Sequence, residues 1–200
     1  MEVAKVEGFS DGVFAVAMTL LIYQVETPRF EEGKSNSGLL NELENLWPYY
    51  LSLFISFFTI LIMWVNHHGI LRLVHRIDSR FMFANGFLLF LIILVPYPTL
   101  LVSEFLLTPS ANTACAVYAG VFLIINLAYN WLWFAARDNG KLLIANITDE
   151  KIKLVTRNYF TGIPIYSIAF AVAFINAYVS LTICMLLWIF WATRVKLNPE

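Results

Sequence analysis

The chain has 200 residues, of which 60% are hydrophobic and only 14% are charged, and its formal net charge is −1. An average soluble domain is about 45–50% apolar and about 25% charged. This composition excludes an ordinary soluble protein, and the near-zero net charge gives no basis for nucleic acid as a partner. Together with a mean hydropathy of +0.71, it predicts a chain embedded in a lipid bilayer.

The second, third and fourth membrane spans are predicted from stretches that lack Asp, Glu, Lys and Arg, because a charge within the bilayer is expensive. The first span is predicted from a largely apolar stretch that contains Asp11 near its start. The first span is expected to end before Pro28, which cannot continue a helix. Pro48 suits the first turn of the second span, and Asp78 or Ser79 can cap the third. Pro96 and Pro98 are expected to kink the third span or to end it early, and Thr108-Pro109-Ser110 precedes the fourth.

The last charge-free stretch, between Arg157 and Arg194, is 36 residues long. A single helix of that length would span about 54 Å, whereas the hydrocarbon core is about 30 Å thick. Two helices separated at Asn176-Ala177-Tyr178 are therefore expected. We predict an all-α polytopic membrane protein with one transmembrane domain, residues 1–200, and six spans at about 8–27, 47–67, 80–104, 111–136, 158–176 and 178–194.

The distribution of Lys and Arg predicts the orientation of these spans, since basic residues are retained in cytoplasmic loops. With the N-terminus inside, the inner segments hold 11 of the 13 basic residues, and the outer segments hold only Arg29 and Lys34. Because the number of spans is even, both termini are expected in the cytoplasm.

Asp11 is the only charged residue placed inside a span rather than at its edge. An acid within the membrane is a candidate functional group. Equally, an acid near the start of a helix can lie among the lipid headgroups, favoured by the positive end of the helix dipole.

A polar group is expected at the inner end of the second span, formed by Trp64, Asn66, His67 and His68. His67 and His68 point about 100° apart on a helix, and His75 is the only other histidine. Hydrogen bonds to Asp11 or Ser10 are favoured over a metal or haem site, and Asn85, at the same height on the third span, can join the group. Contact with headgroups and water is the plainer alternative.

One stripe of the first span combines small, apolar and hydroxyl side chains at helical spacing: Gly12, Val16, Thr19, Leu20 and Tyr23. Such a stripe is more often a helix-packing surface than a pore. The sequence contains no TVGYG filter and no P-loop, GxSxG, HExxH or GxGxxG pattern, so it offers little support for an enzyme.

The segment from Phe9 to Leu21, with Phe-Ser-Asp at its start, closely resembles the opening helix of the transmembrane protein 175 family of endolysosomal potassium channels and their bacterial homologues. The run Trp64-Val65-Asn66-His67-His68, then Asn85 and Val95-Pro96-Tyr97-Pro98-Thr99, are similar to the same family. The family carries Arg four residues before Phe9, where this chain has Lys5. Lys keeps the charge but loses the planar fork of Arg.

The resemblance implies a homotetramer in which the first helix of each subunit surrounds a central pore. Val16, Leu20 and Tyr23 would then form side-chain constrictions in place of a carbonyl filter, with Thr19 as a hydroxyl layer and Gly12 on the same wall. The implied function is a potassium-permeable, potassium-favouring cation channel with no cofactor or bound metal beyond the permeating ion. Its partners would be potassium and other monovalent cations, lipid and its own copies, and its location a bacterial plasma membrane.

By the same resemblance, a second set of residues would hold the first helix in place without touching the ion: Lys5, Phe9, Ser10, Asp11, Trp64, Asn66, His67, His68 and Asn85. Two alternatives remain from other classes. One is a membrane redox or metal protein that uses His67, His68 and His75. The other is a proton-coupled transporter that uses Asp11, although no inverted repeat is evident.

Overall fold

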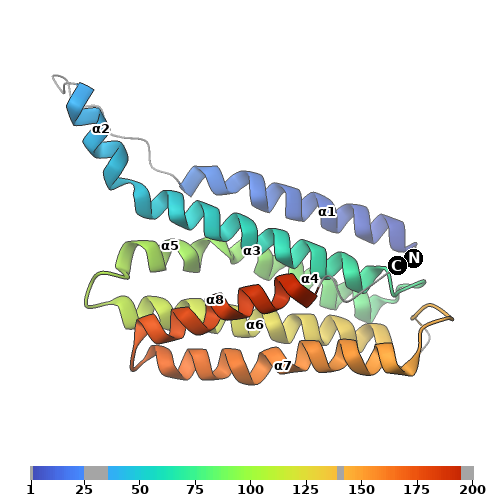
Figure 1. The fold of residues 1–200 in the computed structure, drawn as a ribbon. Helices are drawn as coiled ribbons and strands as arrows, with labels where there is room; N and C mark the ends of the chain where they lie inside the picture. Colours follow the sequence, from blue (N-terminus) through green and yellow to red (C-terminus); the bar gives the residue numbers. More distant parts are fainter. Residues whose placement is uncertain (1, 25–35, 139–141, 195–200) are drawn as a thin grey trace.

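The computed structural model describes residues 2–24, 36–138 and 142–194, and within them all regular structure is helical except for one isolated β-bridge. The long helices lie side by side in an elongated bundle (Figure 1). In chain order the elements are α1 (Val3–Leu20), the short 3₁₀ helix η1 (Leu21–Gln24), α2 (Asn36–Asn45), α3 (Trp47–Leu71), α4 (Ser79–Leu94), α5 (Pro96–Phe105), α6 (Ala111–Arg137), α7 (Asp149–Ala173) and α8 (Ala177–Arg194).

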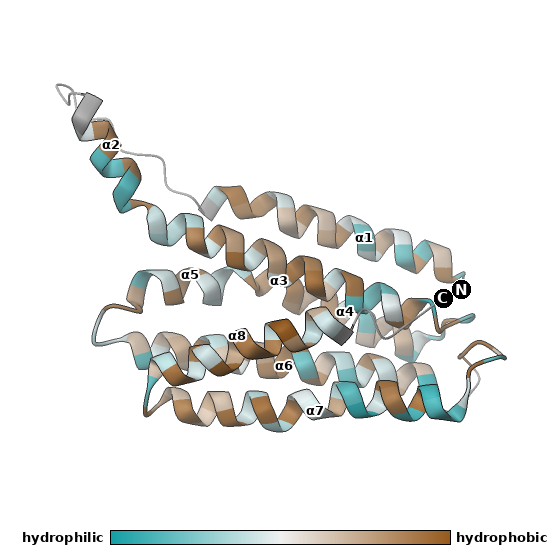
Figure 2. Cartoon of the chain, viewed as in Figure 1, coloured by the Kyte–Doolittle hydropathy of each residue, from teal (hydrophilic) through white to brown (hydrophobic). Residues whose placement is uncertain are grey.

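The prediction of an all-helical membrane protein is confirmed. Four helical segments of the described chain are long and apolar enough to cross a bilayer, namely 3–23, 47–71, 79–105 and 111–137. A shorter apolar helix covers Ala177–Thr193. Figure 2 shows hydrophobic residues along most of the bundle, with hydrophilic residues gathered in α2 and at the end that holds the N-terminus.

Local sequence explains where several of these helices begin and break. Pro48 lies in the first turn of α3, and the Asp78 carboxylate accepts a hydrogen bond from the backbone N–H of Phe81 (2.8 Å), which caps α4. The third predicted span is interrupted at Val95, whose N–H donates to the carbonyl of Ile92, and a new helix starts at Pro96. The expected effect of the prolines is therefore observed.

Helix α7 extends beyond the start of the fifth predicted membrane span, residues 158–176. The helix begins at Asp149, because Thr148 Oγ1 accepts from Lys151 N (3.3 Å) and two acids occupy the first turn. Its break from α8 falls at the expected point. Asn176 Oδ1 accepts from the N–H groups of Tyr178 and Val179 at 3.0 and 3.1 Å, which caps α8.

Helix α2 lies in the connection between the first two predicted spans, where no helix was predicted. Residues 28–35 of this connection lie outside the described part of the chain. Helix α2 contacts α3 and extends away from the bundle (Figure 1). Its Leu and Glu residues are good helix formers. The sequence pattern that was followed, absence of charge, identifies only helices buried in lipid.

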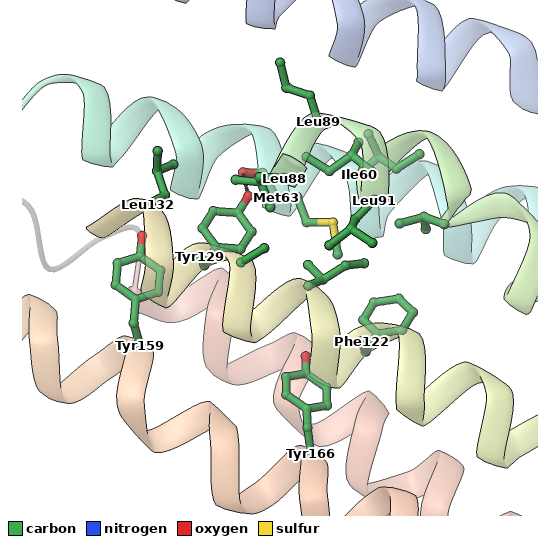
Figure 3. Packing of buried hydrophobic residues seen from close by; sticks show 14 of the residues in the cluster. Ile60, Met63, Leu88, Leu89, Leu91, Phe122, Tyr129, Leu132, Tyr159 and Tyr166 are labelled. Carbon is green, nitrogen blue, oxygen red and sulfur yellow. Dashed lines mark hydrogen bonds between the residues drawn. The ribbon is translucent and has the colours of Figure 1, made fainter. Parts of the chain in front are cut away.

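The centre of the bundle is α6, which packs against α4, α5, α7 and α8. Its buried side chains meet those of α3, α4 and α7, as Figure 3 shows for Met63, Leu88, Phe122, Tyr129 and Tyr159. The Tyr129 hydroxyl donates to the carbonyl of Met63 (2.7 Å), so this buried phenol has a hydrogen-bond partner within the apolar core. Helix α1 lies on the outside of this core, against α3 and α4.

Candidate functional site

Helix α1 is buried along one stripe only. Val6, Ser10, Phe14 and Ala17 are buried against the rest of the subunit, and Leu21 continues this stripe into η1. The spacing of these residues follows the helical repeat. The rest of the helix surface is therefore available to water, to lipid or to another copy of the chain.

The stripe singled out from the sequence lies on this uncovered surface. Val16, Leu20 and Tyr23 are 55%, 52% and 83% exposed, and Gly12 and Thr19 are also exposed. The hydroxyl of Thr19 donates to the carbonyl of Val16 at 3.0 Å, which leaves the lone pairs of its oxygen facing outward. A large apolar surface that stays exposed in one subunit is typical of an interaction or membrane-facing surface.

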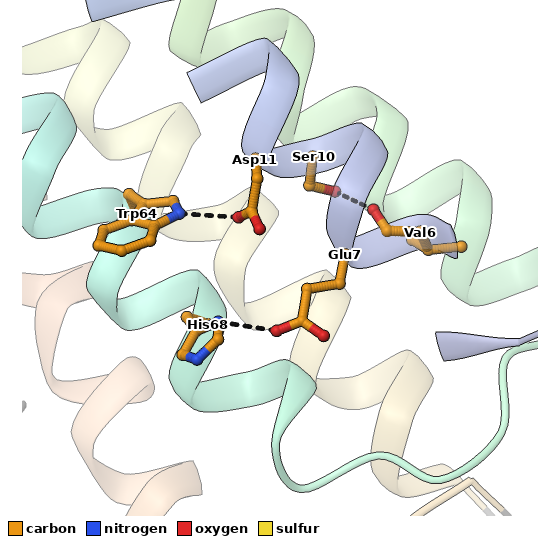
Figure 4. A network of polar contacts seen from close by, with 6 residues as sticks. All are labelled: Val6, Glu7, Ser10, Asp11, Trp64 and His68. Carbon is orange, nitrogen blue, oxygen red and sulfur yellow. Dashed lines mark hydrogen bonds and ion pairs between the residues drawn. The ribbon is translucent and has the colours of Figure 1, made fainter. Parts of the chain in front are cut away.

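Two side chains of α1 face two side chains of α3 in matching order (Figure 4). Trp64 Nε1 donates to Asp11 Oδ1 at 2.8 Å, and one turn away His68 Nδ1 lies 2.9 Å from Glu7 Oε1. The rings of Trp64 and His68 are stacked with centroids 5.9 Å apart. Glu7 and Asp11 are four residues apart on α1, and Trp64 and His68 are four residues apart on α3. The two side chains of each helix therefore point the same way.

A second polar connection joins α1 to α4 through the second histidine. His67 Nε2 lies 2.7 Å from Asn85 Oδ1, and Asn85 Nδ2 donates to Ser10 Oγ at 3.0 Å. Ser10 Oγ in turn donates to the carbonyl of Val6 (2.8 Å). Since Asn85 Oδ1 can only accept, His67 must donate through Nε2. His67, Asn85 and Ser10 are all buried, and the chain of donors fixes the rotation of α1.

Three residues of the expected network lie apart from it within the subunit. The side chain of Lys5 is 72% exposed and pairs with Glu2 at 3.2 Å, and Phe9 is exposed. Asn66 donates to the carbonyl of Ile62 in its own helix. Lys5 and Phe9 lie on the outer side of α1, because positions five residues and one residue before the buried Ser10 are rotated away from it.

Glu7 was missed by the sequence analysis, although it belongs to the site. A signal was present: Glu7 precedes Asp11 by four residues, as Trp64 precedes His68. Two such pairs at the same end of neighbouring helices can contact each other when the helices pack.

The three histidines do not converge. His67 contacts Asn85, His68 faces Glu7, and His75 Nδ1 bonds to the carbonyl of Leu143 at 2.8 Å. No group of three or more His, Cys, Asp or Glu residues in the described part of the chain is placed to hold a metal ion.

The fold and the site together define an integral membrane protein of helical-bundle type, whose first helix is fixed by polar contacts on one side and uncovered on the other. Comparison with known proteins identifies its relatives. The family model described as endosomal/lysosomal potassium channel TMEM175 matches residues 5–96.

Two bacterial potassium channels are similar along nearly their whole length. One from Chamaesiphon minutus is 42% identical over 193 residues, which cover 96% of this chain and 95% of that protein. One from Streptomyces collinus is 35% identical over 177 residues, with 88% and 84% covered. The crystal structure of a lysosomal potassium-selective channel TMEM175 homologue from Chamaesiphon minutus matches with a TM-score of 0.83 at 40% identity, covering 96% of this chain and 97% of that one.

The chain therefore belongs to the TMEM175 family. This is a family of ion channels, not of enzymes.

Proposed function

We propose that this protein is a potassium-permeable, potassium-favouring cation channel in which α1 of each subunit lines a central pore. The observation that carries the proposal is the uncovered stripe of α1, formed by Gly12, Val16, Thr19, Leu20 and Tyr23. It is supported by the relatives, two of which are potassium channels that match along most of the chain. In this proposal four copies assemble with their α1 stripes facing one another.

All six predicted spans cross the membrane in the proposed channel, with both termini in the cytoplasm. The α7 and α8 helices then form the fifth and sixth spans, with the charged start of α7 outside the hydrocarbon core. The excess of Lys and Arg in the segments assigned to the inside supports this orientation. A bacterial plasma membrane is the proposed location.

A ring of Val16 or Leu20 side chains would give the pore a narrow, poorly hydrated neck. A cation must lose part of its water to pass such a neck. Removing water costs more for sodium than for potassium, because the smaller ion holds its hydration shell more tightly. The Thr19 oxygens, whose hydrogens are directed to the helix, would replace part of the lost water and so lower the barrier for potassium.

The polar contacts of α1 with α3 and α4 would act as supports in this channel. They fix the rotation of α1 and thereby keep Val16 and Leu20 directed away from the subunit core. Asp11 accepts a hydrogen bond from Trp64 and lies close to one end of α1. Both features favour a supporting role for Asp11 over proton coupling through it. A proton gradient that drives potassium transport against its own gradient would reverse that preference.

The proposal is tested by potassium efflux from liposomes that contain the purified protein. Vesicles loaded with potassium are diluted into sodium buffer, and the gradients are then reversed. We expect potassium efflux well above that of empty vesicles and slower sodium flux in the reverse arrangement. Leu20→Asn should wet the neck and bring the two rates together, whereas Leu186→Asn, at a residue of α8 that is 61% exposed, should leave their ratio unchanged.

Equal fluxes of the two ions in the wild type would contradict the potassium preference. Unchanged selectivity in both Val16→Asn and Leu20→Asn would contradict the assignment of the neck to this stripe.

A further inference from the structure

The outward side of α7 changes from basic to apolar along its length. A stripe of exposed residues recurs there at helical spacing: Lys153, Arg157, Phe160, Pro164 and Ile168. Figure 2 shows the hydrophilic start of α7 at the end of the bundle that holds the N-terminus, which is the cytoplasmic end in the orientation proposed above. In that orientation this α7 stripe runs from the inner headgroups into the hydrocarbon core, with its two cations at the level of the headgroups.

A third basic side chain, that of Arg137 at the end of α6, lies beside the basic part of the α7 stripe. Its Nη1 donates to the hydroxyl oxygen of Thr156 at 3.1 Å, and its guanidinium carbon lies 4.5 Å from the centroid of the Phe134 ring. Trp133 Nε1 donates to the same Thr156 oxygen at 2.8 Å. These contacts hold the half-buried guanidinium against the residue that precedes Arg157.

The positive charge of these three residues is not balanced by an acid of the described part of the subunit. Lys153, Arg157 and Arg137 form no ion pair with any residue that the structure describes. Asp138, next to Arg137 in the sequence, is paired with Arg80. A guanidinium has five N–H donors, and the contact with Thr156 uses one of those of Arg137. The remaining donors are available to an anion from outside the subunit.

We propose that this surface binds an anionic phospholipid of the inner leaflet. The lipid phosphate accepts hydrogen bonds from the guanidinium of Arg137 and pairs with Lys153 and Arg157, since charge-assisted bonds from Arg and Lys to phosphate are strong. The acyl chains lie along the apolar part of the α7 stripe. That apolar continuation favours a lipid over a soluble phosphate compound, which would meet only the basic end. Asp149, one turn before Lys153, lies further from the bilayer and does not pair with it.

This inference goes beyond ion conduction, and its test does not measure flux. The purified protein is exchanged into equal mixtures of phosphatidylglycerol and phosphatidylethanolamine with identical acyl chains, and the lipids retained per chain are counted by native mass spectrometry. Phosphatidylethanolamine carries the same phosphate but also an ammonium group, which the three cations repel. We therefore expect the wild type to retain phosphatidylglycerol in at least fivefold excess.

Variants separate this site from the general positive charge of the inner end. The double variant Lys153→Gln/Arg157→Gln should lower the phosphatidylglycerol excess below twofold, and Arg137→Gln should lower it at least by half. The control is Arg72→Gln/Arg76→Gln, which removes two exposed cations from the connection that lies beside the α6–α7 connection. This control loses the same charge as the first variant and should keep the excess of the wild type.

A soluble competitor distinguishes a lipid from a free phosphate compound. Glycerophosphoglycerol, the same headgroup without acyl chains, should not displace the retained lipid even in large excess. The proposal is overturned by equal retention of the two lipids in the wild type, by displacement with glycerophosphoglycerol, by an unchanged excess in Lys153→Gln/Arg157→Gln, or by an equal loss in Arg72→Gln/Arg76→Gln. If Arg137→Gln does not fold, the two double variants decide alone, because all four of their residues are exposed.

Discussion

Trp64 and Asp11 are joined across two helices by a hydrogen bond of 2.8 Å from the indole nitrogen to a carboxylate oxygen. The contact connects the first residue of the polar segment of α3, Trp64 to His68, to the third turn of α1. It is charge-assisted, and such bonds are stronger than neutral ones. In the proposed channel it holds the pore-lining helix at one rotation.

Replacing Trp64 by Phe should destabilise the protein by about 1–3 kcal/mol, because Asp11 loses its donor while the aromatic packing is largely kept. Thermal unfolding of the detergent-solubilised protein measures this loss. Trp131→Phe is the matched control, since Trp131 is 40% exposed on α6 and packs against Phe87. An equal loss of stability in both variants would show that the Trp64 indole N–H contributes nothing specific.

Asn85→Leu should be more damaging than Asn66→Leu. Asn85 bridges His67 and Ser10, so its loss leaves a buried imidazole N–H without a partner, at about 1–3 kcal/mol. The side chain of Asn66 bonds only to the carbonyl of Ile62 in its own helix among the described contacts. Chemical denaturation of both variants makes the comparison. Comparable stability of the two would contradict the bridging role of Asn85.

Gly162 permits α7 to approach α6 closely. A Cβ atom at this position would lie 2.3 Å from Asn126 Nδ2 and 2.8 Å from Asn126 Cγ. Gly162→Ala should therefore destabilise the protein by about 1–3 kcal/mol, as overpacking does, and the added change Asn126→Ala should recover part of that loss. Gly86→Ala on α4 meets nothing within 4 Å and should be neutral or stabilising by about 0.5–1 kcal/mol. Denaturation midpoints that rank the two glycine variants in the opposite order would refute the close contact.

Thr19→Val should slow potassium permeation by about tenfold, which corresponds to a barrier about 1.4 kcal/mol higher. The substitution removes the hydroxyl oxygen while keeping the shape of the side chain. Single-channel recording in planar bilayers measures the potassium conductance of the variant. Thr182→Val is the control, because its hydroxyl also bonds to a carbonyl of its own helix but lies on α8. An unchanged potassium conductance in Thr19→Val would show that the Thr19 hydroxyls do not contribute to potassium permeation.

The helices themselves were largely predictable, because their ends depend on local chemistry. Proline at position 96, the Asp78 cap and the polar turn at Asn176 act on the neighbouring backbone, and the sequence shows them directly. Helix α2 and the part of α7 before residue 158 were not predicted, since polar residues can be helical outside the hydrocarbon region and a charge-free window does not detect them.

The polar site was predictable in composition but not in pairing. Ser10, Asp11, Trp64, His67, His68 and Asn85 were all singled out from the sequence, yet which donor meets which acceptor depends on how α1 is rotated against α3 and α4. A small rotation of α1 about its axis brings different side chains of α1 into contact with α3 and α4. The polar group of the second span was expected to bond to Asp11 or Ser10. Trp64 bonds to Asp11, His67 reaches Ser10 through Asn85, and Glu7, which was not predicted, lies beside His68.

Cysteine modification at the α1 stripe tests the central proposal most directly. A cationic thiol reagent is added to liposomes that contain Leu20→Cys or Leu107→Cys protein, and potassium efflux is recorded with labelling verified by mass spectrometry. The native Cys115 and Cys184 are buried, and Leu107, which lies just after α5, is 78% exposed. Efflux should fall to the level of empty vesicles for Leu20→Cys and remain unchanged for Leu107→Cys. Undiminished efflux through fully labelled Leu20→Cys protein would contradict a pore lined by α1.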